Sequence, residues 1–301
     1  MWRSLKWECD GESITFSDEH RAAVFMDFGA FQSGAASGVY DRRSSPGIDG
    51  TVTYAASMSG MSLTINARVL AYNIGSRENP VERVLDQYHR KLCSLFHPCR
   101  TGRLTYITHN GSYFVDARAV STPGFGSIEG GTLSFTVDLY SDEPYWQSTH
   151  LYELNIGVSD PAVTFPSEIA GQMGDIIKTW ASIPNTTHNE LYPVIRIWPS
   201  ESVPMIVNET TGKSIRLNTH ITGGFYVDVD TAPTKNTVSL YRLDDTTGTY
   251  VPTDNVTHWL TLDSDTDFSI VPGVNSIRAE YITSNVYPAV TMMWREREVG
   301  I

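Results

Sequence analysis

The sequence contains little cysteine, few basic residues and no long apolar run. Its three cysteines, Cys9, Cys93 and Cys99, are too few to form a disulfide framework in a chain of 301 residues. We therefore expect a fold held by its own cores, in a reducing compartment. Lysine and arginine number 22 against 34 aspartates and glutamates, which gives a formal charge of -12. This balance disfavours stable binding to nucleic acid.

Signals for membranes and export are also missing. No apolar run reaches the roughly 20 residues that a membrane-spanning helix needs. Residues 1–16 are interrupted by Arg3, Lys6, Glu8 and Asp10, so they lack the apolar segment of a signal peptide. We therefore expect no signal peptide and no membrane insertion.

The sequence lacks the common catalytic motifs. It has no Gly-x-Ser-x-Gly elbow, no P-loop and no His-Glu-x-x-His. The acidic stretch Asp263-Ser264-Asp265-Thr266-Asp267 resembles the opening of a calcium-binding loop. However, Phe268 and Val274 stand where an EF-hand needs glycine and glutamate, so a solvated turn is the better interpretation. We expect neither an enzyme nor a cofactor.

One segment places His89, Cys93 and His97 four residues apart, with Cys99 just beyond. Residues i and i+4 share a helix face, so the spacing is compatible with zinc. The favoured interpretation is that Cys93 packs as a small hydrophobe with the histidines exposed beside it. No metal site is expected.

Strand signals dominate what is present. Apolar and polar residues alternate over residues 63–69, 133–139 and 225–229. The turn pairs Asn110-Gly111 and Pro272-Gly273 are expected to join strands on both sides, with Gly273 supplying the positive φ of a type II turn. Short strands with frequent turns favour a mainly β protein.

A single amphipathic helix interrupts the strands. Asn79 is expected to cap it, Pro80 to take its first position and Pro98 to end it. Its apolar stripe consists of Val81, Leu85, Tyr88, Leu92 and Leu95. Residues 168–182 are a candidate for a second short helix, although two glycines there disfavour the helical conformation.

The pattern loosens after Tyr145-Trp146, where prolines and glycines become frequent. We place a domain boundary there. Residues 1–148 are expected to form a β-sandwich or barrel with one helix, and residues 149–301 a second β-sandwich of short strands.

The aromatic residues of the second domain allow two interpretations. Trp180, Trp198, Tyr226, Tyr241 and Trp259 could stack on sugar rings, which makes a carbohydrate-binding protein the alternative function. Of these, Trp198, Tyr226 and Trp259 are the candidate glycan contacts. On alternating strands, such residues more often belong to a core or an interface. Binding of glycans by a monomer would distinguish the two.

Residues 31–50 offer little apolar surface for a core, because Gly34, Ala35, Ala36 and Gly38 are small. One interpretation is a mobile surface loop. The other is an arm that pairs with the sheet edge of a neighbouring subunit. The contact residues of such an arm are Gln32, Ser33, Val39, Tyr40, Arg42 and Arg43.

Several short stretches occur in one order along nearly the whole chain. They are Glu78-Asn79-Pro80, Gly102-Arg103-Leu104-Thr105-Tyr106, Ser-Phe-Thr-Val-Asp-Leu-Tyr-Ser-Asp-Glu-Pro-Tyr-Trp at 134–146, Tyr-Pro-Val-Ile-Arg-Ile at 192–197, Asn-Glu-Thr-Thr-Gly at 208–212, Val-Pro-Gly-Val-Asn at 271–275 and Met-Trp-Arg-Glu-Arg-Glu at 293–298. This set resembles the distal tail protein family of long, non-contractile-tailed bacteriophages, the siphophages. The resemblance implies an N-terminal β domain with one helix, assembled as a hexameric ring, and a galectin-like β-sandwich outside the ring. It implies no catalytic residues.

The same resemblance implies a place at the distal end of the phage tail, reached by assembly in the host cytoplasm. The ring would link the tail tube to the host-adsorption apparatus. Its partners would be further copies of the chain, the tail tube protein, the tape measure protein, and a tail-associated lysin or receptor-binding and baseplate proteins. In this family an extended hairpin of the first domain helps to clasp the ring, which favours the arm interpretation of residues 31–50. A glycan hydrolase of the tail tip would instead need a carboxylate pair across a cleft.

Overall fold

The chain divides into two compact units that we describe separately. A computed structural model describes residues 3–28, 31–44, 49–76, 80–156, 177–199, 203–281 and 290–301. The first unit comprises Met1–Thr149 with Glu298–Ile301, and the second comprises His150–Arg297. Most described residues lie in strands and one α-helix occurs among them, so the predicted mainly β fold is confirmed.

The first unit is built on a sheet that closes on itself. Seven strands follow one another around it in the order β7 (Ser112–Ala119), β6 (Thr101–Ile107), β1 (Ser4–Cys9), β2 (Glu12–Ser17), β3 (Val24–Met26), β5 (Val52–Leu70) and β9 (Thr132–Ser141). The end strands then meet, because Arg118 and Ala119 of β7 pair with Tyr140 and Leu139 of β9. The predicted β domain is therefore closed as a barrel, which leaves these seven strands without a free sheet edge over the paired residues.

Four further strands extend this barrel. β10 (Trp146–Ser148) pairs with β7 and carries β21 (Arg297–Glu298) on its other side. β8 (Gly124–Glu129) pairs with β9, and β4 (Gln32–Arg43) pairs with β5. A short 3-10 helix, η1 (Ala71–Asn73), follows β5.

The helix α1 (Val81–Leu95) starts one residue later than predicted. Pro80 is its N-cap in an extended conformation, and the carbonyl of Pro80 accepts a hydrogen bond from the Val84 N–H at 3.1 Å. The predicted cap Asn79 lies outside the described residues. The apolar stripe packs onto the barrel core as expected, with Val84 as an additional buried member.

Trp7 of β1 joins the helix to the barrel. Its indole Nε1–H donates a buried hydrogen bond to the carbonyl of Leu95 at 3.0 Å, which satisfies one of the carbonyls that a helix leaves unpaired at its C-terminal end. The indole also stacks on Phe96, with ring centroids 5.2 Å apart. Gly102 of β6 lies against the same ring, where its missing side chain leaves the indole its space.

The second unit is a β-sandwich, as the sequence predicted. Its six-stranded sheet has the order β11 (Tyr152–Ile156), β20 (Val290–Trp294), β13 (Val194–Ile197), β16 (Phe225–Asp230), β17 (Thr237–Asp244) and β18 (Thr249–Asn255). Its four-stranded sheet has the order β12 (Ile177–Asn185), β19 (Gly273–Tyr281), β14 (Met205–Asn208) and β15 (Lys213–Arg216). Both sheets contribute to one buried apolar cluster, and the 3-10 helix η2 (Thr257–Trp259) follows β18.

Two sequence predictions in this unit need correction. The C-terminal part of the helix expected over residues 168–182 is strand instead, because residues 177–182 belong to β12; residues 168–176 lie outside the described residues. Extended pairing with β19 overrides the weak helical pattern there. Gly273 has the expected positive φ of 103°. Only one side of this turn is a strand, since the buried Phe268 and Ile270 lie in an irregular segment before β19.

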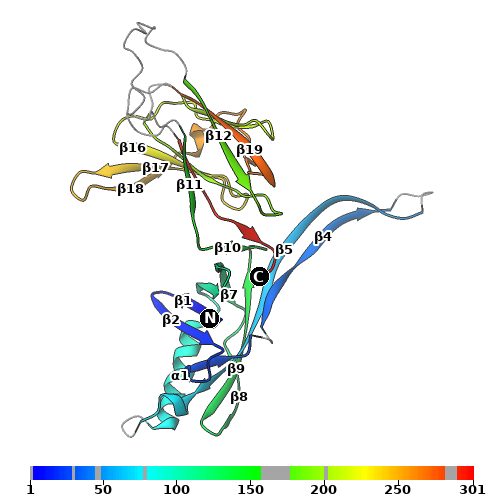
Figure 1. The fold of residues 1–301 in the computed structure, drawn as a ribbon, viewed down its shortest axis with the longest axis vertical. Coiled ribbons are helices and arrows are strands. Elements are labelled where there is room, and N and C mark those ends of the chain that lie inside the picture. Colours follow the sequence, from blue (N-terminus) through cyan, green and yellow to red (C-terminus); the bar gives the residue numbers. More distant parts are fainter. Residues whose placement is uncertain are drawn as a thin grey trace. The chain divides into compact units, whose positions relative to one another are not determined.

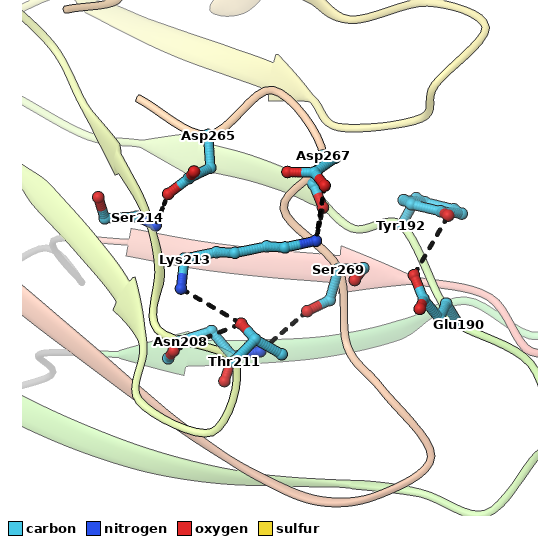
Figure 2. A network of polar contacts seen from close by, with 9 residues as sticks. All are labelled: Glu190, Tyr192, Asn208, Thr211, Lys213, Ser214, Asp265, Asp267 and Ser269. Atoms are coloured by element: carbon cyan, nitrogen blue, oxygen red, sulfur yellow. Dashed lines mark hydrogen bonds and ion pairs between the residues drawn. The ribbon is translucent and has the colours of Figure 1, made fainter. Parts of the chain in front are cut away.

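A polar network ties that irregular segment to β14 and β15 (Figure 2). The fully buried Asn208 donates from Nδ2 to the carbonyl of Ser269 at 2.8 Å. The Ser214 N–H donates to the Asp265 carboxylate at 2.7 Å. Lys213 Nζ lies 2.8 Å from the Asp267 carboxylate, and its hydrogen bond lowers the pKa of Asp267. The acidic stretch therefore forms hydrogen bonds and an ion pair within the folded unit, in agreement with a turn.

Candidate interaction surfaces

The first candidate surface is the outer part of the β4–β5 hairpin, which we call the arm and define as residues 37–43 and 52–59. β5 pairs with β9 only from Met61 onward, whereas its pairing with β4 continues to Arg43 opposite Val52. Figure 1 shows the two strands extending together beyond the barrel strands. Over the arm each strand therefore has one described neighbour, the other strand of the hairpin.

Large side chains on the arm are exposed. Val39 and Tyr40 are each 52% exposed, Val52 is 53% exposed and Tyr54 is 66% exposed. A two-stranded ribbon is only marginally stable in water without further packing. These exposed side chains make the arm a candidate contact surface.

Arginine and tyrosine form two pairs on the arm. The guanidinium of Arg42 lies 4.6 Å from the centre of the Tyr40 ring, and that of Arg43 lies 5.3 Å from the centre of the Tyr54 ring. Arg43 also contacts the Asp41 carboxylate at 3.2 Å. These contacts order the side chains while leaving them at the surface, which suits them to meet a partner.

The structure brings the six predicted contact residues onto one strand. Gln32 and Ser33 lie at the base of β4, and Val39, Tyr40, Arg42 and Arg43 lie on the arm. The loop interpretation of residues 31–50 was wrong for Gln32–Arg43, which pair with β5; residues 45–48 lie outside the described residues. The sequence analysis also missed the contribution of β5, although Val52 and Tyr54 are strand-favouring residues.

The second candidate surface lies on the outer face of the six-stranded sheet. Trp198, Tyr226, Tyr241 and Tyr250, which we call the aromatic cluster, come from or follow four different strands. The ring centroid of Tyr226 lies 4.7 Å from the ring centroids of both Tyr241 and Tyr250, and 5.3 Å from that of Trp198. Tyr226 is 5% exposed at the centre, whereas the other three are half-buried around it. Burial raises the pKa of the Tyr226 hydroxyl.

A row of polar residues lies beside the aromatic cluster. The register of the strands aligns Asn155, Thr291, Arg196 and Asp228 across β11, β20, β13 and β16. Arg196 donates two hydrogen bonds to the Asp228 carboxylate, at 2.8 and 2.9 Å, and these bonds raise the pKa of the guanidinium. The same guanidinium lies 4.1 Å from the centre of the Tyr226 ring. The polar row and the aromatic cluster are thus one connected arrangement.

Of the three residues proposed for glycan contact, Trp198 and Tyr226 come together and Trp259 does not. Trp259 lies in η2 and packs against the core of the sandwich. The sequence analysis missed Tyr250, Arg196 and Asp228. Arg196 and Asp228 each stand between two apolar residues of a strand, which places them on the outer face, but their pairing depends on a register that local pattern does not reveal.

The histidines and cysteines of the α1 region make other contacts. His89 stacks on Phe125 with ring centroids 4.1 Å apart, and His97 Nδ1 accepts a hydrogen bond from the Cys99 N–H at 3.2 Å. Within the described ranges, no group of three or more histidine, cysteine or acidic side chains is placed to hold a metal ion. None of the helices among the described residues has the length and apolar character to cross a membrane.

Solved structures share this fold over the whole chain. The Dit protein (gp 19.1) of phage SPP1, described as a paradigm of the hub adsorption apparatus in phages that infect Gram-positive bacteria, aligns with a TM-score of 0.56 and 15% identity over 98% of this chain and 99% of that chain. A chain of the phage P2 baseplate in its activated conformation with Ca aligns with a TM-score of 0.51 and 13% identity over 100% of both chains. No protein-family model and no curated protein matches the sequence. The likeness establishes a shared fold that includes both units.

Proposed function

We propose that this protein is a distal tail protein of a siphophage, a structural hub of the tail tip with no catalytic role. The observation that carries the proposal is the shared fold with the SPP1 Dit protein over 98% of this chain and 99% of that one. A match that covers both units is more specific than a match of either sandwich or barrel alone. The order of short sequence stretches supports the same family.

The proposed assembly is a hexameric ring that joins the tail tube to the host-adsorption apparatus. Head-to-tail contacts close into a ring when the rotation between subunits allows it. The arm supports such a contact, because it extends one subunit by a ribbon with exposed Val39, Tyr40 and Tyr54. The ring's further partners would be the tail tube and tape measure proteins on one side and a lysin, receptor-binding or other baseplate proteins on the other. Assembly in the host cytoplasm would place it at the distal end of the tail in the virion.

Native mass spectrometry tests the ring directly. We expect a dominant species of six times the 33.5 kDa monomer at micromolar concentration. The six-fold species should show a central opening by negative-stain electron microscopy. Spectra that show only the monomer at micromolar concentrations would contradict the proposal.

Duplex DNA should not be retained by the assembled ring. The chain carries a formal charge of -12, and a pore that releases DNA needs few cationic contacts with phosphate. Fluorescence polarisation with labelled duplex at physiological salt should show no binding. Tight binding that disappears in an Arg42→Ala, Arg43→Ala variant would overturn this expectation.

A further inference from the structure

The outer face of the six-stranded sheet carries an arrangement that a tail-tip hub does not require. Four aromatic rings gather there beside a row of hydrogen-bonded polar side chains. Most outer sheet faces are solvated and polar. A second apolar cluster on that side, separate from the core of the sandwich, therefore needs an explanation of its own.

The rings differ in what they offer to a ligand. Tyr226 stacks at 16° to the Tyr241 ring and also contacts the guanidinium of Arg196, so it serves as the support of the cluster. Trp198, Tyr241 and Tyr250 surround this support and retain part of their surface in solvent. They provide flat apolar surface at three positions around one point of the sheet.

A strand irregularity shapes the same region. The pairing of β17 with β18 shifts between Leu240 and Tyr241, so that Tyr241 faces Pro252 and Thr253 has no partner in the register. Such bulges re-aim side chains and occur often beside functional sites. Here the bulge stands next to the stretch of β18 that places Tyr250 over Tyr226.

The polar row is ordered and carries no excess charge. The Arg196 charge is matched by Asp228 through two hydrogen bonds, and their side chains are only 26% and 12% exposed. Trp198 Nε1–H donates to Thr291 Oγ1 at 3.0 Å, and Thr291 Oγ1–H donates to Asn155 Oδ1 at 2.6 Å. Side chains held in this way are already arranged before a ligand arrives, which lowers the entropic cost of binding.

We propose that this face binds a neutral saccharide chain. The apolar faces of sugar rings would stack on Trp198, Tyr241 and Tyr250, and hydroxyl groups would hydrogen-bond to the neighbouring Asn155, Arg196 and Asp228. The internal pairing of Arg196 and the formal charge of -12 argue against an anionic ligand. The proposal concerns the second unit and does not depend on the ring.

The test uses the full chain and neutral hexasaccharides of glucose, N-acetylglucosamine, galactose and mannose. At least one of them should change the tryptophan fluorescence, with a dissociation constant between about 1 μM and 1 mM. Tyr250→Ala should weaken that binding about five- to tenfold, the worth of one stacking contact. Tyr250 lies near the exposed end of the β17–β18 hairpin, so its replacement should leave the fold intact, which thermal unfolding would verify.

The matched control is Trp180→Ala. Trp180 is an exposed tryptophan on β12 in the other sheet, and its loss should leave saccharide affinity unchanged. No binding of any hexasaccharide, or binding that Tyr250→Ala and Trp198→Ala leave unchanged, would overturn the proposal. The proposal would also be overturned if the parent protein bound no saccharide and the Tyr250→Ala variant lost a protein partner. That result would favour a protein-docking surface.

Discussion

Replacing residues 37–60 with an Asn-Gly pair should convert the proposed hexamer into a folded monomer, a change from six chains to one. The deleted residues contain the whole arm, including its exposed Val39, Tyr40, Val52 and Tyr54. Fully burying one such side chain is worth roughly 1.5–3 kcal/mol. Four of them at each subunit contact would contribute enough to decide whether a ring forms.

The design should leave the first unit folded. Ala36 pairs directly with Met61, so a two-residue turn can join them as a tight hairpin. The buried core of this unit includes Met61 and takes no side chain from the described arm residues. Pairing of β5 with β9 from Met61 to Leu70 also remains. Circular dichroism should therefore still show a β-sheet spectrum, reduced only by the strand residues of the deleted segment.

A second shortened hairpin provides the control for the arm. Residues 245–248 join Asp244 of β17 to Thr249 of β18, and an Asn-Gly pair can replace them without touching the arm. This variant should remain hexameric in native mass spectrometry. If the variant that lacks residues 37–60 is still a hexamer, the arm does not hold the ring together. The proposal that the protein forms a ring would remain.

The sequence revealed local structure better than it revealed how strands meet. Period-two alternation located strands such as β9, and helical spacing located α1, because both patterns lie within a few residues. Closure of the barrel depends on Arg118 and Ala119 meeting Tyr140 and Leu139, a pairing that no local signal contains. Long-range registers of this kind are set by the packing of the whole unit.

The two candidate surfaces show the same limit. The stretch from Gly34 to Gly38 lacks the alternation of apolar and polar residues that marks a strand, so the inner part of β4 resembled a loop. Its strand conformation comes from pairing with β5. Similarly, Trp198 and Tyr226 were recognisable as aromatic residues of the second domain, but only the pairing of β13 with β16 brings them together.

Gly102→Ala should destabilise the first unit by about 3 kcal/mol or more. A Cβ atom at this position would overlap the Trp7 indole and lie 2.7 Å from the carbonyl oxygen of Glu8. The carbonyl belongs to the neighbouring strand and cannot move without disturbing the β1–β6 pairing. The indole cannot move either, because it is buried, stacked on Phe96 and hydrogen-bonded to Leu95. The added methyl group must therefore strain the junction between α1 and the barrel.

Gly124→Ala is the matched control in the same unit. Gly124 also lies in a strand, but the atom nearest to an added Cβ there is the Thr136 carbonyl oxygen at 3.9 Å, an ordinary contact. Its effect should stay within about 0.5 kcal/mol. Urea unfolding followed by tryptophan fluorescence and circular dichroism would compare the two variants. Equal midpoints would contradict the packing of Trp7 against Gly102.

A Trp7→Phe, Gly102→Ala double variant separates the steric overlap from the lost hydrogen bond. Because the smaller phenylalanine ring relieves the overlap, the double variant should lose less stability than the sum of the losses in the two single variants.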